Sequence, residues 1–183
     1  GGAAHWAKVI LELKSLGYED IRAVENPLTS LADDAERTRK MIAQVGGPVV
    51  LVGHSYGGAV ISEAGNHPNV AALVFVAAFA PDKGESPGGI TQKHLPVAAP
   101  NLVPDSDGYL WLKPDKFHES FCQDLSSDDG FVMAATQKAP LASTFGDTVS
   151  PKKVLTLDAS HASLASHPAE IAKLIQEAAT STV

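Results

Sequence analysis

Apolar side chains recur along this chain in two rhythms, one with helical spacing and one in short continuous runs. Residues 4–16 carry an apolar side chain every three or four positions, which predicts a helix that Gly17 ends. Residues 20–26 form a short run that Pro27 closes, and we predict a strand there. This part of the chain is therefore predicted to be a helix followed by a strand.

A second helix is predicted to begin at Ser30. Serine is a favoured N-cap residue, and Asp33 stands three positions later, where a capping box places its second side chain. The Gly-Gly-Pro sequence at 46–48 ends the pattern. One apolar stripe of this helix is expected to be buried, and it contains Leu31, Ala35, Thr38, Ile42 and Val45.

The elements that follow alternate between helices and strands that are apolar on both faces. Residues 48–53 and 70–79 are apolar and rich in β-branched side chains, as strands of a parallel sheet are, and a short helix is predicted between them at 57–64. A further strand is predicted at 154–157 and a final helix at 168–179. This alternation predicts an α/β fold with a mostly parallel sheet flanked by helices.

The composition and the periodicity of the sequence change over residues 81–151. This stretch is rich in proline and in turn-forming residues and shows little clean periodicity before the amphipathic stretch 113–125. We interpret it as an inserted cap or lid. The expected organisation is a single domain comprising residues 1–183, with the cap inserted at about 81–151.

Composition and charge limit the kinds of molecule that the protein is expected to bind. Apolar residues make up 44% of the 183 residues and the formal charge is −7, which fits a globular protein and argues against a nucleic-acid partner. A single cysteine, Cys122, excludes an internal disulfide. No apolar run is long enough to cross a bilayer and no signal peptide is visible, so we expect no membrane partner and a cytoplasmic protein. The sequence begins at Gly1 rather than Met, which weakens that expectation, and it leaves the oligomeric state open, a homodimer included.

The clearest chemical signal is the pentapeptide at 53–57, Gly-His-Ser-Tyr-Gly, which fits the pattern G-x-S-x-G between a predicted strand and a predicted helix. A sharp strand-to-helix bend holds its serine, Ser55, in a strained backbone conformation and leaves little room for side chains on either side. The helix that follows directs its positive end toward Ser55, and the Tyr56 backbone N–H is a natural donor to an oxyanion. We therefore predict that Ser55 is a nucleophile.

A serine nucleophile needs a base, and His161 is the best placed of the seven histidines. It follows the last predicted strand, so it is expected at the same carboxyl edge of the parallel sheet as Ser55. The other histidines lie in predicted helices, turns or the cap. The histidines are scattered without ligand spacing, and no glycine-rich dinucleotide fingerprint is present, so we predict neither a metal nor a cofactor.

Long stretches of the chain resemble the α/β-hydrolase superfamily, and within it a bacterial esterase branch related to plant methylesterases and hydroxynitrile lyases. The matching stretches are residues 26–86, 107–125 and 159–175. The resemblance implies an α/β-hydrolase fold without a cofactor. It also implies that Ser55 is the nucleophile, His161 the base and Tyr56 N–H an oxyanion donor.

The chain departs from that family in two places. The family's first strand and most of the loop that supplies a second oxyanion N–H are not visible before residue 4, and Ala3 is the residue we assign to that role. The strand that carries the triad acid also has no room between Phe145 and His161, which leads us to expect a break in the sequence near residues 150–153. The acid is therefore unassigned, with Asp82 and Asp158 as weak candidates and Glu85 behind them.

The function expected from these residues is that of a serine carboxylesterase acting on small, hydrophobic esters through an acyl-enzyme. One alternative is cleavage of a cyanohydrin, as in hydroxynitrile lyases, although those lyases place a lysine after the histidine where this chain has Ala162 and Ser163. A second alternative is a hydrolase-like scaffold that binds a small ligand with little or no turnover, which only the missing acid supports. The sequence does not identify the physiological ester or the enantiomer preference.

Overall fold

A computed structural model of the 183-residue chain describes residues 2–150, 163–166 and 168–180. Strand β1 (Val49–His54) pairs in parallel with β2 (Val70–Val76), with Val52 opposite Val74 and Gly53 opposite Phe75. Among the described residues the parallel sheet has these two strands. That agrees with the expectation that strands of the family sheet are absent from this sequence.

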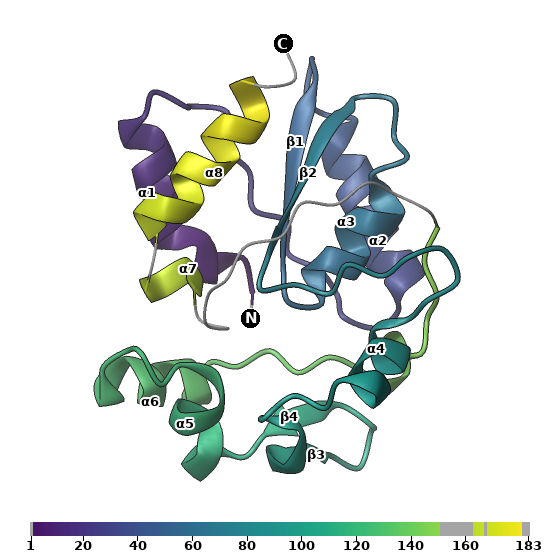
Figure 1. The fold of residues 1–183 in the computed structure, drawn as a ribbon, viewed down its shortest axis with the longest axis vertical. Helices are drawn as coiled ribbons and strands as arrows, with labels where there is room; N and C mark the ends of the chain where they lie inside the picture. The colour runs from purple at the N-terminus through teal and green to yellow at the C-terminus, as the bar shows by residue number, and fades with distance from the viewer. Residues whose placement is uncertain (1, 151–162, 167, 181–183) are drawn as a thin grey trace.

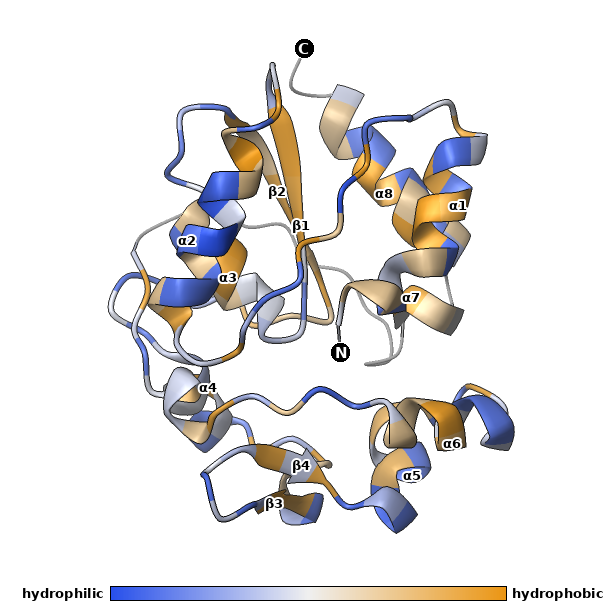
Figure 2. Cartoon of the chain, turned by 180° about the vertical axis from the view of Figure 1, so that it is seen from behind, coloured by the Kyte–Doolittle hydropathy of each residue, from blue (hydrophilic) through white to orange (hydrophobic). Residues whose placement is uncertain are grey.

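Helices cover both faces of this sheet (Figure 1). On one side α3 (Gly57–Ala64) packs against β1 and α2 (Leu31–Ile42) packs against α3. On the other side α8 (Pro168–Thr180) packs against both strands and α1 (Ala7–Ser15) packs against α8. Both strands are strongly apolar (Figure 2), and separate apolar clusters are buried on the two sides of the sheet. The cluster on the side of α1 and α8 comprises Val9, Leu13, Val74, Val76, Leu164, Ile171, Ala172 and Ile175.

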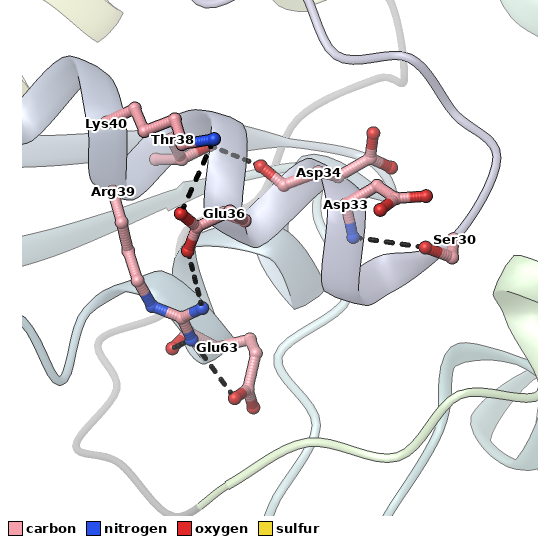
Figure 3. Close-up of polar contacts among 8 residues, drawn as sticks. All are labelled: Ser30, Asp33, Asp34, Glu36, Thr38, Arg39, Lys40 and Glu63. Atoms are coloured by element: carbon pink, nitrogen blue, oxygen red, sulfur yellow. Dashed lines mark hydrogen bonds and ion pairs between the residues drawn. The ribbon is translucent and has the colours of Figure 1, made fainter.

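Helix α2 begins where the capping pattern predicted. The Asp33 N–H donates to Ser30 Oγ at 3.0 Å, which satisfies one of the free donors at the helix start (Figure 3). Near the other end of the helix, Arg39 lies 3.2 Å from the Glu63 carboxylate on α3. A cap and an inter-helix ion pair therefore fix both the start of α2 and its position beside the sheet.

The prediction of a strand at 20–26 is wrong, because these residues form neither a strand nor a helix. A strand needs a neighbour for its backbone hydrogen bonds, and β1 pairs only with β2 among the described strands. The first helix also differs in detail from the prediction, because Ala3–Trp6 form a 3-10 turn, η1, before α1. The predicted strand at 70–79 ends earlier, at Val76.

Residues 87–145 form a separate layer at the end of the sheet where β1 turns into α3 (Figure 1), and we call it the inserted layer. A small core of Leu112, Phe117 and Cys122 holds part of it together. Its elements are α4 (Pro87–Lys93), η2 (Ala99–Asn101), β3 (Leu102–Pro104), β4 (Leu110–Leu112), η3 (Pro114–Lys116), α5 (Phe117–Phe121), α6 (Ser127–Ala135) and η4 (Ala142–Phe145).

The chain enters and leaves this layer at one point. Gly84 N–H donates to the Val149 carbonyl at 2.9 Å, and Val149 N–H donates to the Glu85 carbonyl at 3.0 Å. Beyond this point the predicted strand at 154–157 lies outside the described residues. The structure resumes with α7 (Ser163–Ser166), and the predicted last helix is present as α8.

Candidate active site

Ser55 lies in the tight turn between β1 and α3, with φ at +56°. A left-handed conformation is rare outside glycine and costs about 1–2 kcal/mol, so surrounding contacts have to impose it. Two backbone hydrogen bonds do so. Ser55 N–H donates to the Ala77 carbonyl at 3.2 Å, and Phe79 N–H donates to the Ser55 carbonyl at 3.0 Å. The end of β2 therefore clamps the serine on both sides.

Close packing around the turn explains two of its glycines. A Cβ on Gly53 would lie 2.5 Å from the Gly57 carbonyl oxygen, and one on Gly58 would lie 2.0 Å from the Phe79 carbonyl oxygen. Both contacts are to backbone, which cannot rotate away. A Cβ on Gly57 meets nothing within 4 Å. The second crowded glycine is thus Gly58, one residue beyond the G-x-S-x-G motif.

The backbone of Tyr56 starts helix α3, with φ −55° and ψ −28°. Among the described residues nothing accepts a hydrogen bond from its N–H, which leaves this donor available at the positive end of the helix. Ser55, by contrast, is only half-buried, while the Tyr56 ring points inward and is 7% exposed. The turn therefore offers a hydroxyl and a free amide side by side.

A cavity of about 1400 Å³ opens in front of this turn. Ser55, Tyr56 and Phe79 line it from the α/β part, and the inserted layer contributes mainly apolar side chains. The cavity also extends along β1 to residues 20–26. Its lining from the inserted layer includes Ile90, Leu102, Leu110, Leu112, Phe117 and Phe121.

Behind the turn, the Tyr56 hydroxyl is buried against two acidic side chains of the α/β part. Burial raises the pKa of Tyr56, and the negative charges of Asp34 and Asp147 raise it further. Asp34 is fully buried, and this burial raises the pKa of its carboxyl. The phenol therefore stays protonated and is a hydrogen-bond donor at any ordinary pH.

The N-terminal residue assigned to the second oxyanion donor is engaged elsewhere in this structure. Ala3 N–H donates to the Glu25 carboxylate at 2.7 Å. Lys138, on the segment that returns from the inserted layer, donates to the same carboxylate and to the Asn26 carbonyl. The hydrogen bonds from Lys138 and Ala3 lower the pKa of Glu25. Acting as an oxyanion donor would require Ala3 to exchange this partner.

Of the remaining predicted residues, the structure describes Asp82 and Glu85. Asp82 is exposed and its N–H donates to Glu85, whose other carboxylate oxygen pairs with Lys93 at 2.8 Å. His161 and Asp158 lie outside the described residues, as does the expected break after residue 150. The described part of the candidate site is therefore the turn at Ser55 and its cavity.

Other titratable side chains near the cavity do not assemble into a metal centre. Within the described ranges no group of three His, Cys, Asp or Glu side chains could hold a metal ion. His5 lines the cavity, and burial lowers its pKa. No helix of the described residues is long and apolar enough to span a membrane.

Sequence reasoning missed Asp34, Glu25 and Lys138. Asp34 follows the exposed Asp33 in the first turn of α2, where acidic residues are common, so its type alone does not indicate burial. Glu25 and Lys138 are 113 positions apart, so no local pattern joins them. A carboxylate in the buried stripe of α2, one turn before Thr38, was the one available signal.

Comparison with known proteins gives the family. The chain matches the Alpha/beta hydrolase family over residues 3–155, and it belongs to that family. It is 33% identical over 135 residues to Methylesterase 7 of Arabidopsis thaliana, which covers 63% of this chain and 49% of the relative. It is 27% identical over 138 residues to a protein of Phoma sp. named as a probable hydrolase, covering 67% of this chain and 55% of the relative. The chain thus spans about half the length of these curated relatives.

Solved structures share the fold at low sequence identity. A pyrethroid hydrolase from Sphingobium faniae JZ-2 superposes with a TM-score of 0.75 at 20% identity, covering 98% of this chain and 93% of the other. A methylesterase from Arabidopsis superposes with a TM-score of 0.74 at 14% identity, covering 98% and 94%. The α/β-hydrolase fold predicted from the sequence is confirmed, as is the relation to methylesterases.

Proposed function

We propose that the protein is a serine hydrolase that cleaves small carboxylic esters with a hydrophobic acyl or alcohol part. The observation that carries this proposal is the backbone of Ser55, which is clamped at φ +56° at the start of α3 and faces a largely apolar cavity. Relatives named as hydrolases and methylesterases support the same reaction class. The size of the cavity leaves room for a substrate larger than an acetate ester.

The reaction we propose is acyl transfer in two steps. Ser55 Oγ attacks the ester carbonyl while His161 takes the hydroxyl proton, and Tyr56 N–H stabilises the oxyanion. His161 then gives the proton to the leaving alcohol. Water, activated by the same histidine, attacks the acyl-enzyme and releases the acid. A second donor from the N-terminal loop, assigned to Ala3, completes the oxyanion site once its amide leaves Glu25.

Turnover of p-nitrophenyl acetate tests this proposal directly. Ser55→Ala is expected to lower kcat by at least about 10³-fold, because it removes the atom that forms the acyl-enzyme. A fluorophosphonate should label the peptide that contains Ser55, located by mass spectrometry. The matched control is Ser62→Ala on α3, a buried serine that does not line the cavity, which should keep both turnover and labelling.

Further measurements separate the alternative functions. Release of cyanide from mandelonitrile, abolished by Ser55→Ala, would favour a hydroxynitrile lyase. Binding of an ester without turnover and without labelling of Ser55 would favour a ligand-binding scaffold. Turnover that survives Ser55→Ala would exclude the proposed nucleophile.

A further inference from the structure

Asp34 is a buried carboxyl behind the Ser55 turn that interacts with two neighbouring segments, the loop before α2 and Tyr56. Asp34 lies in the first turn of α2 and is fully buried, whereas its neighbour Asp33 is exposed. Burying a carboxyl is costly, so a buried carboxyl generally has specific polar partners. The Asp34 carboxyl therefore needs polar partners, and these come from other segments of the chain.

The first partner is the loop that precedes α2. The Leu28 N–H donates to Asp34 Oδ1 at 2.8 Å, and Leu28 has φ +65°, a left-handed conformation that a leucine adopts only under constraint. The Leu28 carbonyl in turn accepts a hydrogen bond from Leu141 N–H at 2.9 Å. Leu28 lines the cavity. One oxygen of Asp34 thus holds a strained residue in the cavity wall.

The second partner is the residue after the nucleophile. Tyr56 packs in one buried cluster with Leu28, the residue whose N–H donates to Asp34. Beyond burial, the charge of the Asp34 carboxyl and its hydrogen bonding raise the pKa of Tyr56, and hydrogen bonding to Tyr56 opposes the rise that burial produces in the pKa of Asp34. Asp34 Oδ2 and the Tyr56 hydroxyl are both buried and do not complete a bond of ordinary geometry with any described residue. Since an unmade buried hydrogen bond is costly, a small rotation that joins these two atoms is the natural resolution.

Fixing the Tyr56 ring also fixes the peptide bond that precedes it. The ring is held further by Phe145, at 5.7 Å between centroids. The Ser55–Tyr56 peptide carries the N–H that the proposed reaction uses for its oxyanion, and such donors act only when they are held in place beforehand. We infer that Asp34 is a positioning residue that aligns the Tyr56 amide and the Leu28 wall with Ser55. This inference rests on the proposed function.

The test compares Tyr56→Phe, Asp34→Asn and their double variant in turnover of p-nitrophenyl acetate. Tyr56→Phe keeps the ring and removes only the hydroxyl. We expect each single variant to lower kcat about tenfold with KM changed less than twofold, and the double variant to be no slower than the slower single one. Asp33→Asn, an exposed change of the same charge on the same helix, is the matched control and should retain wild-type kcat.

The outcomes separate this inference from the proposed function. A merely structural role would lower the thermal midpoint while kcat, measured well below that midpoint, stayed at the wild-type value, and this result overturns the inference alone. Additive losses in the double variant would also overturn it. Absence of both turnover and Ser55 labelling in the wild-type protein would overturn the proposed function and the inference together. If Asp34→Asn does not fold, the kcat of Tyr56→Phe decides.

Discussion

The turn at Ser55 and the inserted layer differ in how tightly they are packed. In the turn, a single added carbon at Gly58 would lie 2.0 Å from the Phe79 carbonyl oxygen, and backbone hydrogen bonds hold Ser55 on both sides. In the inserted layer the elements are short and several apolar side chains face solvent, among them Val97 at 87% exposure and Phe131 at 76%. Both regions line the same cavity, but one is fixed by backbone contact and the other by small side-chain clusters.

The difference indicates how the two regions divide the work that we propose. A site that positions reacting atoms needs a rigid backbone, which the turn has. A wall that selects among substrates can vary in its side chains without moving the nucleophile. We therefore expect substitutions in the turn to act on folding and rate, and substitutions in the inserted layer to act on local packing and substrate preference.

The largest effect is expected from Gly58→Ala. Its Cβ meets backbone at 2.0 Å, so the turn has to move, and we expect a loss of about 3 kcal/mol in the free energy of unfolding together with most of the esterase turnover. Gly57→Ala is the matched control because its Cβ meets nothing within 4 Å, and its stability should change by less than about 1 kcal/mol. Urea unfolding measures both. Equal losses in the two variants would show that the contacts at Gly58 do not fix the turn.

A smaller and more local effect is expected from Leu112→Ala in the inserted layer. Leu112 is 5% exposed and packs in the cluster with Phe117 and Cys122, so its truncation should cost about 2 to 4 kcal/mol. Val97→Ala removes an exposed side chain and should stay within about 0.5 kcal/mol of the wild-type protein. Thermal unfolding of the two variants makes the comparison. If Val97→Ala is as destabilising as Leu112→Ala, the exposed face of the layer is covered in solution.

The smallest effect concerns the ion pair that joins Lys138 of the inserted layer to Glu25, in the segment before α2. The pKa of Glu25 is lowered in the folded protein, chiefly by the Lys138 hydrogen bond, so its contribution to stability is present above its ordinary pKa of 4.5 and is lost as the pH falls through the lowered value. The pair is well exposed, 34% for Lys138 and 51% for Glu25, which limits the contribution to about 1 kcal/mol or less.

Glu25→Gln should therefore be less stable than the wild-type protein at pH 7, and the gap should narrow below pH 4.5. In a Lys138→Met background the same substitution should produce a smaller gap, because the dominant partner is gone. A gap that is unchanged in that background would mean that the Ala3 amide, rather than Lys138, governs the carboxylate.

Local sequence signals predicted the parts of the fold that local contacts determine. The cap at Ser30, the apolar run that forms β1 and the turn around Ser55 each follow from neighbouring residues, and all three are present. The strand predicted at 20–26 failed because a strand depends on a partner elsewhere in the chain. The little room expected on either side of Ser55 is present at Gly53 but not at Gly57, because Phe79 packs against Gly58.

The site was predictable to the same extent. One motif was enough to place Ser55 and the Tyr56 amide in the turn after β1, and their catalytic roles stay predictions. The engagement of Ala3 by Glu25 and the burial of Asp34 arise from contacts between distant segments. His161 as base, Asp82 or Asp158 as acid, and the division into one domain with a cap stay predictions.

The paired hydrogen bonds between Gly84, Glu85 and Val149 have a consequence for engineering. Because the two ends of the intervening stretch meet like neighbouring rungs of a ladder, roughly 5 Å apart, the whole stretch can be exchanged for another of different length without stretching the scaffold below it. The molecule thus has a junction at which a different stretch could be joined to change the pocket, provided that the new stretch replaces the contacts that Lys138, Leu141 and Phe145 make with the scaffold.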